Sequence, residues 1–205
     1  MAPARMSRAD SRRWRAARTP ADLGHLMALW LEGGLGSRPG YEPHWGPDDE
    51  TTALIPTLAA LCRAGYITTC SQPGLTGTGA NGRWWEQRAA VTGLVTDEAL
   101  LARLLRSAAD TRMNTCVNHL RRRGGRQGQP IVVTTCDGQP VTAFGGRIRR
   151  ADLAPEWAGT HPRLFAQIAT GTYLTIAAPA YGTTGQNLWR TIQRTLRPRP
   201  CSTSG

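Results

Sequence analysis

Apolar side chains recur at the spacing of an amphipathic helix in several stretches of the chain. The first stretch follows Thr19-Pro20, which is typical of a helix start because threonine caps the first turn and proline fits the first helical position. Gly33 and Gly34 end this stretch, since glycine favours helix C-termini. By the same reasoning, four further helices are expected at about 48–65, 97–105, 161–169 and 186–196.

Segments rich in β-branched and aromatic residues alternate irregularly with these helices. The expected strands cover 66–70, 86–95, 112–118, 131–135, 141–148 and 173–177. Because no regular β-α alternation is present, the pattern predicts an α+β fold, with mixed β-sheets flanked by helices. We expect one folded domain over 19–197, a basic flexible tail over 1–18 and a second flexible tail over 198–205.

The chain of 205 residues carries a net charge of +11, and all 25 of its basic Lys and Arg side chains are arginine. One interpretation is a nucleic-acid-binding surface. The other, which we favour, is codon bias in a GC-rich genome, because basic charge alone indicates solubility and non-specific binding. The arginines cluster at both ends of the chain and at 121–123, within an expected loop over 121–128.

Cysteine usage and hydropathy point to a reducing, aqueous compartment. The five cysteines are odd in number and lack paired spacing, so no disulfide framework is expected. Cys116 and His119 have ligand-like spacing, but one such pair cannot form a closed zinc site, and we assign no metal. No apolar run has the length of a membrane span, and no signal peptide is recognisable. The sequence thus predicts a cytoplasmic protein.

Polar side chains with ligand-binding chemistry gather around one expected strand. Glu50-Thr51 opens a helix, Thr68 and Ser71 flank the end of the strand over 66–70, and a Gly/Pro turn follows directly. Hydroxyls and carboxylates can satisfy the amine, carboxylate and ribose groups of a small polar ligand. The residues alone also fit as turn and capping residues, and without further information we favour that interpretation.

The order of these motifs resembles the S-adenosylmethionine-binding regulatory domain at the C-terminus of eukaryotic methylenetetrahydrofolate reductases. In sequence order, the matching elements are Leu31-Glu32-Gly33, Glu50-Thr51, the stretch Gly-Tyr-Ile-Thr-Thr-Cys-Ser-Gln-Pro over 65–73, Gln87-Arg88-Ala89 and Asn187-Leu188-Trp189. The similarity covers about 20–110 and, more loosely, 170–196. Residues 119–160 lack the Thr-Trp-Gly and Gln-Pro-Thr signatures of that family, and Arg88 stands where the family usually has lysine.

The resemblance implies a fold like that of the regulatory domain and a ligand. It implies that Glu50, Thr51, Thr68 and Ser71 help to bind S-adenosylmethionine or S-adenosylhomocysteine. Thr134 is one replacement for a missing threonine of the family. With the flanking polar residues, the implied ligand-binding set is Glu50, Thr51, Thr68, Ser71, Gln72, Gln87, Arg88 and Thr134. No catalytic barrel is present, so the chain is not a folate reductase.

We expect these residues to line one pocket between the start of the Glu50 helix, the end of the Thr68 strand and the strand of Gln87. Arg88 is expected to pair with Glu50 when the site is empty, or with a ligand carboxylate when it is occupied. Trp84-Trp85 is expected to border the pocket, either as a stacking platform or as one buried and one exposed ring.

Three functions remain open on the sequence. The first is a binding module for S-adenosylmethionine or a relative, acting on an unidentified partner protein. The second is an enzyme that uses such a ligand, for example in methyl transfer; the absence of an acid-base or nucleophile pattern in the sequence disfavours it, and no catalytic residue is assigned. Cys70 has no adjacent activating base and is expected to be a buried thiol. The third is a nucleic-acid-binding protein.

Overall fold

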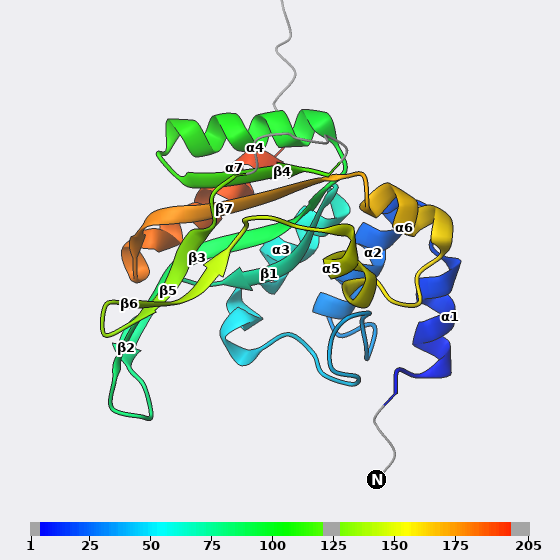
Figure 1. Cartoon of the computed structure of the whole chain (residues 1–205), viewed down its shortest axis with the longest axis horizontal. Coiled ribbons are helices and arrows are strands. Elements are labelled where there is room, and N and C mark those ends of the chain that lie inside the picture. The colour runs from blue at the N-terminus through cyan, green and yellow to red at the C-terminus, as the bar shows by residue number, and fades with distance from the viewer. Residues whose placement is uncertain (1–4, 121–127, 198–205) are drawn as a thin grey trace, which may run out of the picture.

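The computed structural model describes residues 5–120 and 128–197 (Figure 1). The helices and strands in these ranges are α1 (Arg8–Ala16), α2 (Pro20–Leu31), η1 (Asp49–Leu54), α3 (Ile55–Arg63), β1 (Tyr66–Gln72), β2 (Thr76–Thr78), β3 (Trp84–Val95), α4 (Glu98–Asp110), β4 (Asn114–His119), β5 (Ile131–Cys136), β6 (Gln139–Phe144), α5 (Arg150–Glu156), α6 (Pro162–Ile168), β7 (Thr172–Tyr181), η2 (Thr183–Gln186) and α7 (Asn187–Leu196). Residues 121–127 of the loop expected over 121–128, and the C-terminal tail from 198, lie outside the described residues.

The long strand β3 organises the sheet. Its second half pairs with β1 on one edge and β7 on the other, and β4 lies beyond β7. Its first half pairs with β2 and β5, and β6 lies beyond β5. Every one of these pairings is antiparallel, so the α+β class is confirmed, whereas the expectation of mixed sheets is wrong. Hydrophobic spacing reveals a strand but not the direction of its neighbour.

Helices α2, α3, α4 and α7 pack against the half of the sheet formed by β1, β3, β7 and β4. Figure 1 shows α4 along β4, and α1, α2, α5 and α6 gathered at the opposite end from the β2 and β6 hairpins. The leucines whose spacing predicted the helices are buried here, among them Leu23, Leu58, Leu61, Leu100 and Leu104. None of the helices in the described ranges is long and apolar enough to cross a membrane.

Two helix starts illustrate how local sequence sets the fold. The Thr19 side chain accepts a hydrogen bond from the backbone N–H of Asp22, and the Asp22 carboxylate accepts one from Thr19 N, which completes a capping box. The second expected helix starts at Asp49 as the 3₁₀ turn η1 and becomes α-helical only at Ile55. Pro56 lies in the first turn of α3, where its missing N–H does not interrupt a helical hydrogen bond.

The expected N-terminal tail needs correction, because residues 8–16 form helix α1. The Ser7 hydroxyl caps it by accepting a hydrogen bond from Asp10 N at 3.0 Å. Trp14 is 1% exposed, and its indole N–H donates to the Ser37 carbonyl at 2.9 Å. The stretch is rich in arginine and has a single large apolar side chain, so it shows no helical periodicity. The folded part therefore begins about ten residues earlier than expected.

Candidate functional site

A cavity of about 270 Å³ opens between the C-terminal end of α2, the following loop, η1, α3 and β1. Its volume is slightly below the range of about 300–1,000 Å³ that is typical of small-molecule sites. We call it the β1 pocket; it is lined by Trp30, Leu31, Arg38, Tyr41, Pro47, Asp48, Thr51, Leu58, Thr68, Thr69, Cys70 and Ser71.

A β-bulge in β1 shapes one wall of this pocket. Thr68 pairs with Gly93 and Cys70 pairs with Thr92, which leaves Thr69 as an extra residue on β1. The Thr69 hydroxyl lies 3.4 Å from the Thr92 carbonyl. Neighbouring residues of a regular strand point to opposite faces, but a bulge breaks this alternation and redirects side chains. The four consecutive residues 68–71 all line the pocket as a result.

Three of the predicted ligand-binding residues meet here. Thr51, at the start of η1, is nearly buried, and Thr68 and Ser71 lie on β1 across the pocket. The Thr68 hydroxyl is 3.4 Å from the sulfur of Cys62, which lies near the C-terminal end of α3. Thr51, Thr68 and Ser71 thus line one cavity, but Glu50 does not.

Glu50 and Gln87 lie outside the pocket wall. Glu50 is exposed, and its carboxylate accepts a hydrogen bond from Gln87 Nε2 at 3.4 Å. This contact links η1 to β3, but neither side chain lines the cavity.

Arg88 is directed elsewhere, so its expected pairing with Glu50 is wrong. Its Nη1 donates to the carbonyl oxygens of Ala178 at 3.1 Å and of Pro179. Its guanidinium carbon lies 4.1 Å from the ring centroid of Tyr181. Successive strand residues face opposite sides of a sheet, so Arg88 points away from the face on which Gln87 meets Glu50.

Gln72 and Thr134 serve the sheet interior rather than the cavity. Gln72 is 5% exposed, and its amide N–H groups donate to the carbonyls of Arg88 at 3.0 Å and Val133 at 2.8 Å. Its amide oxygen accepts a hydrogen bond from the Thr134 hydroxyl at 3.2 Å. Neither residue lines the β1 pocket, which corrects the expectation that both contact the ligand.

Two further expectations, on the burial of Cys70 and on the position of Trp84-Trp85, are also corrected. Cys70 is exposed at the pocket instead of being buried. Desolvation by the surrounding protein raises the pKa of its thiol, and the Glu156 carboxylate adds to this shift. Trp84 and Trp85 do not line the pocket; Trp84 is 48% exposed, and the Trp85 indole lies 3.3 Å from the Asn81 side-chain oxygen.

Sequence reasoning missed a charged side chain in the pocket wall, that of Arg38. The Arg38 guanidinium carbon lies 5.1 Å from the Trp30 ring centroid and 4.9 Å from that of Tyr41. Its Nη1 donates to Glu156 at 2.8 Å. The Tyr41 hydroxyl donates to the Asp48 carboxylate at 2.9 Å. In sequence, Arg38 and Tyr41 belong to an aperiodic Gly/Pro-rich loop, which carries no signal for their convergence.

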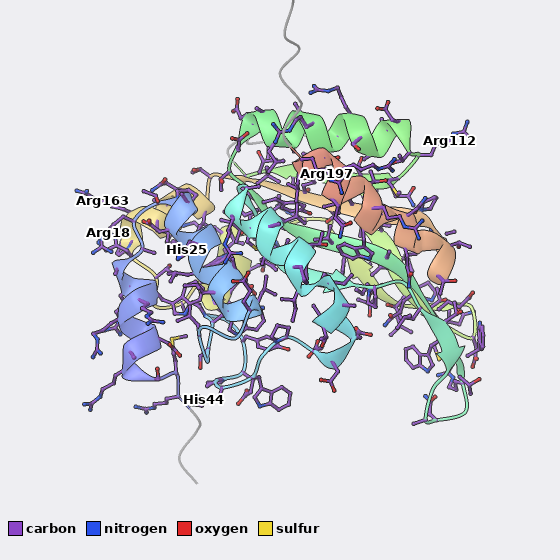
Figure 2. The ribbon with its side chains drawn as sticks, turned by 180° about the vertical axis from the view of Figure 1, so that it is seen from behind. Arg18, His25, His44, Arg112, Arg163 and Arg197 are labelled. Atoms are coloured by element: carbon purple, nitrogen blue, oxygen red, sulfur yellow. The ribbon has the colours of Figure 1, made fainter. Side chains whose placement is uncertain are left out.

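A second concave surface lies between α4 and α7 and measures about 800 Å³. We call it the α4–α7 groove; it is lined by Arg103, Arg106, Ser107, Asp110, Thr111, Arg194, Thr195, Leu196 and Arg197. Figure 2 shows Arg197, at the end of α7, beneath α4, and Arg112 beyond the end of α4. Within 5–120 and 128–197, no group of three or more His, Cys, Asp or Glu side chains is arranged to hold a metal ion.

The chain belongs to the family described as "Domain of unknown function (DUF6919)", whose model matches residues 9–199. The match begins within α1, in agreement with the folded boundary described above. A search of curated proteins found no match.

Proposed function

We propose that this protein binds a small polar molecule in the β1 pocket, with S-adenosylmethionine or S-adenosylhomocysteine as the ligand, and that it serves as a sensor module for a partner protein. The observation that carries the proposal is the convergence of Thr51, Thr68 and Ser71 on one cavity. These are three of the four positions to which the resemblance to methylenetetrahydrofolate reductase regulatory domains assigns ligand contacts.

The chemistry of the pocket suits a ligand with both polar and apolar parts. The hydroxyls of Thr51, Thr68 and Ser71 can donate to and accept from ribose or carboxylate groups. The rings of Trp30 and Tyr41 and the aliphatic side chains of the wall offer surface to a thioether or a nucleobase.

Calorimetric titration of the full chain with both ligands tests the proposal. Removing two hydroxyls in Thr68→Ala/Ser71→Ala should weaken binding by about 1–3 kcal/mol, because each lost hydrogen bond contributes about 0.5–1.5 kcal/mol. The matched control is Thr52→Ala/Thr78→Ala, which removes two exposed hydroxyls outside the pocket and should leave the affinity unchanged. Absence of binding by the unmodified protein at millimolar ligand would refute the proposal.

A second candidate function, nucleic-acid binding, is supported by the α4–α7 groove. Four arginines and one aspartate line it. Such an excess of positive charge attracts phosphate backbones without sequence preference. A gel shift with single-stranded DNA at low salt tests this candidate, and an absent shift under those conditions would remove it.

A further inference from the structure

The guanidinium of Arg38 is buried and incompletely hydrogen-bonded, although Arg38 belongs to a loop. Only 6% of its side chain is exposed, and the rings of Trp30 and Tyr41 lie beside it. Its Nη1 donates to Glu156 and, at 3.3 Å, to the Pro39 carbonyl. Its Nε is buried and has no hydrogen-bond partner among the described residues. Burying a guanidinium without satisfying all of its donors is costly, so the protein alone leaves this group short of acceptors.

Asp48 provides the opposite charge on the same pocket wall. It occupies the N-cap position of η1, yet its side chain makes no capping hydrogen bond. Instead, one carboxylate oxygen accepts a hydrogen bond from the Tyr41 hydroxyl at 2.9 Å, and the residue lines the pocket. An aspartate at this position ordinarily bonds the first backbone N–H groups of the helix. Here Tyr41 holds it towards the cavity.

Arg38 and Asp48 flank Tyr41 without forming an ion pair with each other, since Arg38 pairs with Glu156. The pocket wall therefore presents a guanidinium, whose charge Glu156 partly balances, beside a carboxylate, and each group keeps hydrogen-bonding capacity. A simple anion would meet the repulsion of Asp48, and a simple cation that of Arg38. A zwitterion satisfies both groups.

We infer that Arg38 and Asp48 form the subsite for a zwitterionic α-amino-acid group, with the ligand carboxylate on Arg38 and its ammonium on Asp48. The inference rests on the proposed function in placing the amino-acid end of S-adenosylhomocysteine there. The remaining pocket surface, including Thr51 and Ser71, is left for the rest of the ligand. Asp48, rather than Glu50, then supplies the carboxylate on the pocket wall.

Calorimetry with three probes tests the subsite: S-adenosylhomocysteine, 5′-methylthioadenosine, which lacks the amino-acid end, and L-methionine, which lacks the nucleoside. The first should bind at least about tenfold more tightly than the second, because charge-assisted hydrogen bonds are the strong ones. Asp48→Asn should weaken S-adenosylhomocysteine binding about tenfold and leave 5′-methylthioadenosine unaffected. The control Asp49→Asn removes the same charge from an exposed neighbour outside the pocket and should change neither.

Asp48→Asn carries the test because it keeps the acceptor for Tyr41, whereas Arg38→Gln also removes the contact with Glu156 and lowers stability. Equal affinity for S-adenosylhomocysteine and 5′-methylthioadenosine, unchanged in Asp48→Asn, would overturn the subsite while the proposed function stands. Binding of L-methionine alone, lost in Asp48→Asn, would support the subsite and refute the proposed ligands. If neither these three probes nor S-adenosylmethionine binds at millimolar concentration, both the subsite and the proposed function fail.

Discussion

The β1 pocket and the α4–α7 groove both contain arginine, but they hold it in opposite ways. Arg38 in the pocket is almost fully buried, contacts two aromatic rings and pairs with Glu156. Arg103, Arg106 and Arg194 in the groove are exposed, and none of them forms an ion pair with a described carboxylate. A charge fixed by neighbours can select one ligand geometry, whereas solvated charges produce a field that attracts any polyanion.

Substituting an arginine of the pocket and one of the groove should differ most in the effect on the free energy of unfolding. Arg38→Ala leaves Glu156 partly buried without its partner and removes the side chain that packs beside the rings of Trp30 and Tyr41. Breaking a buried ion pair costs about 3–5 kcal/mol, and because Glu156 is 29% exposed we expect about 3 kcal/mol. Arg106→Ala, the control in the groove, should change the free energy of unfolding by less than about 0.5 kcal/mol. Urea denaturation measures both, and equal losses would erase the distinction between the two regions.

A second comparison lies within β1, between adjacent residues that face the cavity and the sheet interior. Gln72→Ala leaves the buried carbonyls of Arg88 and Val133 without a donor, so the free energy of unfolding should fall by about 2 kcal/mol. Ser71→Ala should leave stability nearly unchanged and weaken ligand binding instead. Thermal denaturation and calorimetry on the two variants separate these roles. A stable Gln72→Ala protein with impaired binding would return Gln72 to the ligand site.

Binding of nucleic acid to the α4–α7 groove should depend on the salt concentration. If the groove binds single-stranded DNA, Arg103→Gln/Arg194→Gln should weaken binding about tenfold at low salt and flatten the dependence of log Kd on log salt by about 1.4, or about 0.7 per lost phosphate contact. Fluorescence anisotropy measures both values. The control Arg8→Gln/Arg12→Gln removes the same charge from exposed positions on α1. Equal weakening in both variants would assign binding to the overall charge of the chain rather than to the groove.

Local signals explain which parts of the fold could be predicted. The leucines of α2, α3 and α4 repeat at helical spacing, and caps such as Thr19 and Asp97 mark helix starts, so these helices were expected near their observed positions. Helix α1 lacks that repeat and is held by Trp14, whose partner Ser37 lies in a distant loop. Its burial depends on tertiary packing, which spacing along the sequence does not encode.

The site shows the same division. Thr51, Thr68 and Ser71 were expected to lie together from the order of their motifs along the chain, and all three line the β1 pocket. Arg88 could not be placed, since an error of one residue in strand parity moves a side chain to the other face of a sheet. Arg38 owes its role to Glu156, 118 residues later in the chain. The local sequences around Arg38 and Glu156 do not indicate that these two residues pair.

The smallest expected effect concerns Cys70, which can report on the pocket itself. Cys62, Cys116 and Cys136 are buried, so in a Cys201→Ser background, which removes the cysteine outside the described residues, an alkylating reagent should modify Cys70 alone in the folded protein. Because desolvation by the surrounding protein raises the pKa of this thiol, it holds less of the reactive thiolate at neutral pH, and its reaction should accelerate only above the usual thiol value of about 8.5. A bound ligand should slow the reaction further, since Cys70 lines the pocket. Mass spectrometry of labelling time courses at several pH values, with and without S-adenosylhomocysteine, measures both effects. Labelling that is unaffected by a ligand shown to bind by calorimetry would place that ligand outside the β1 pocket.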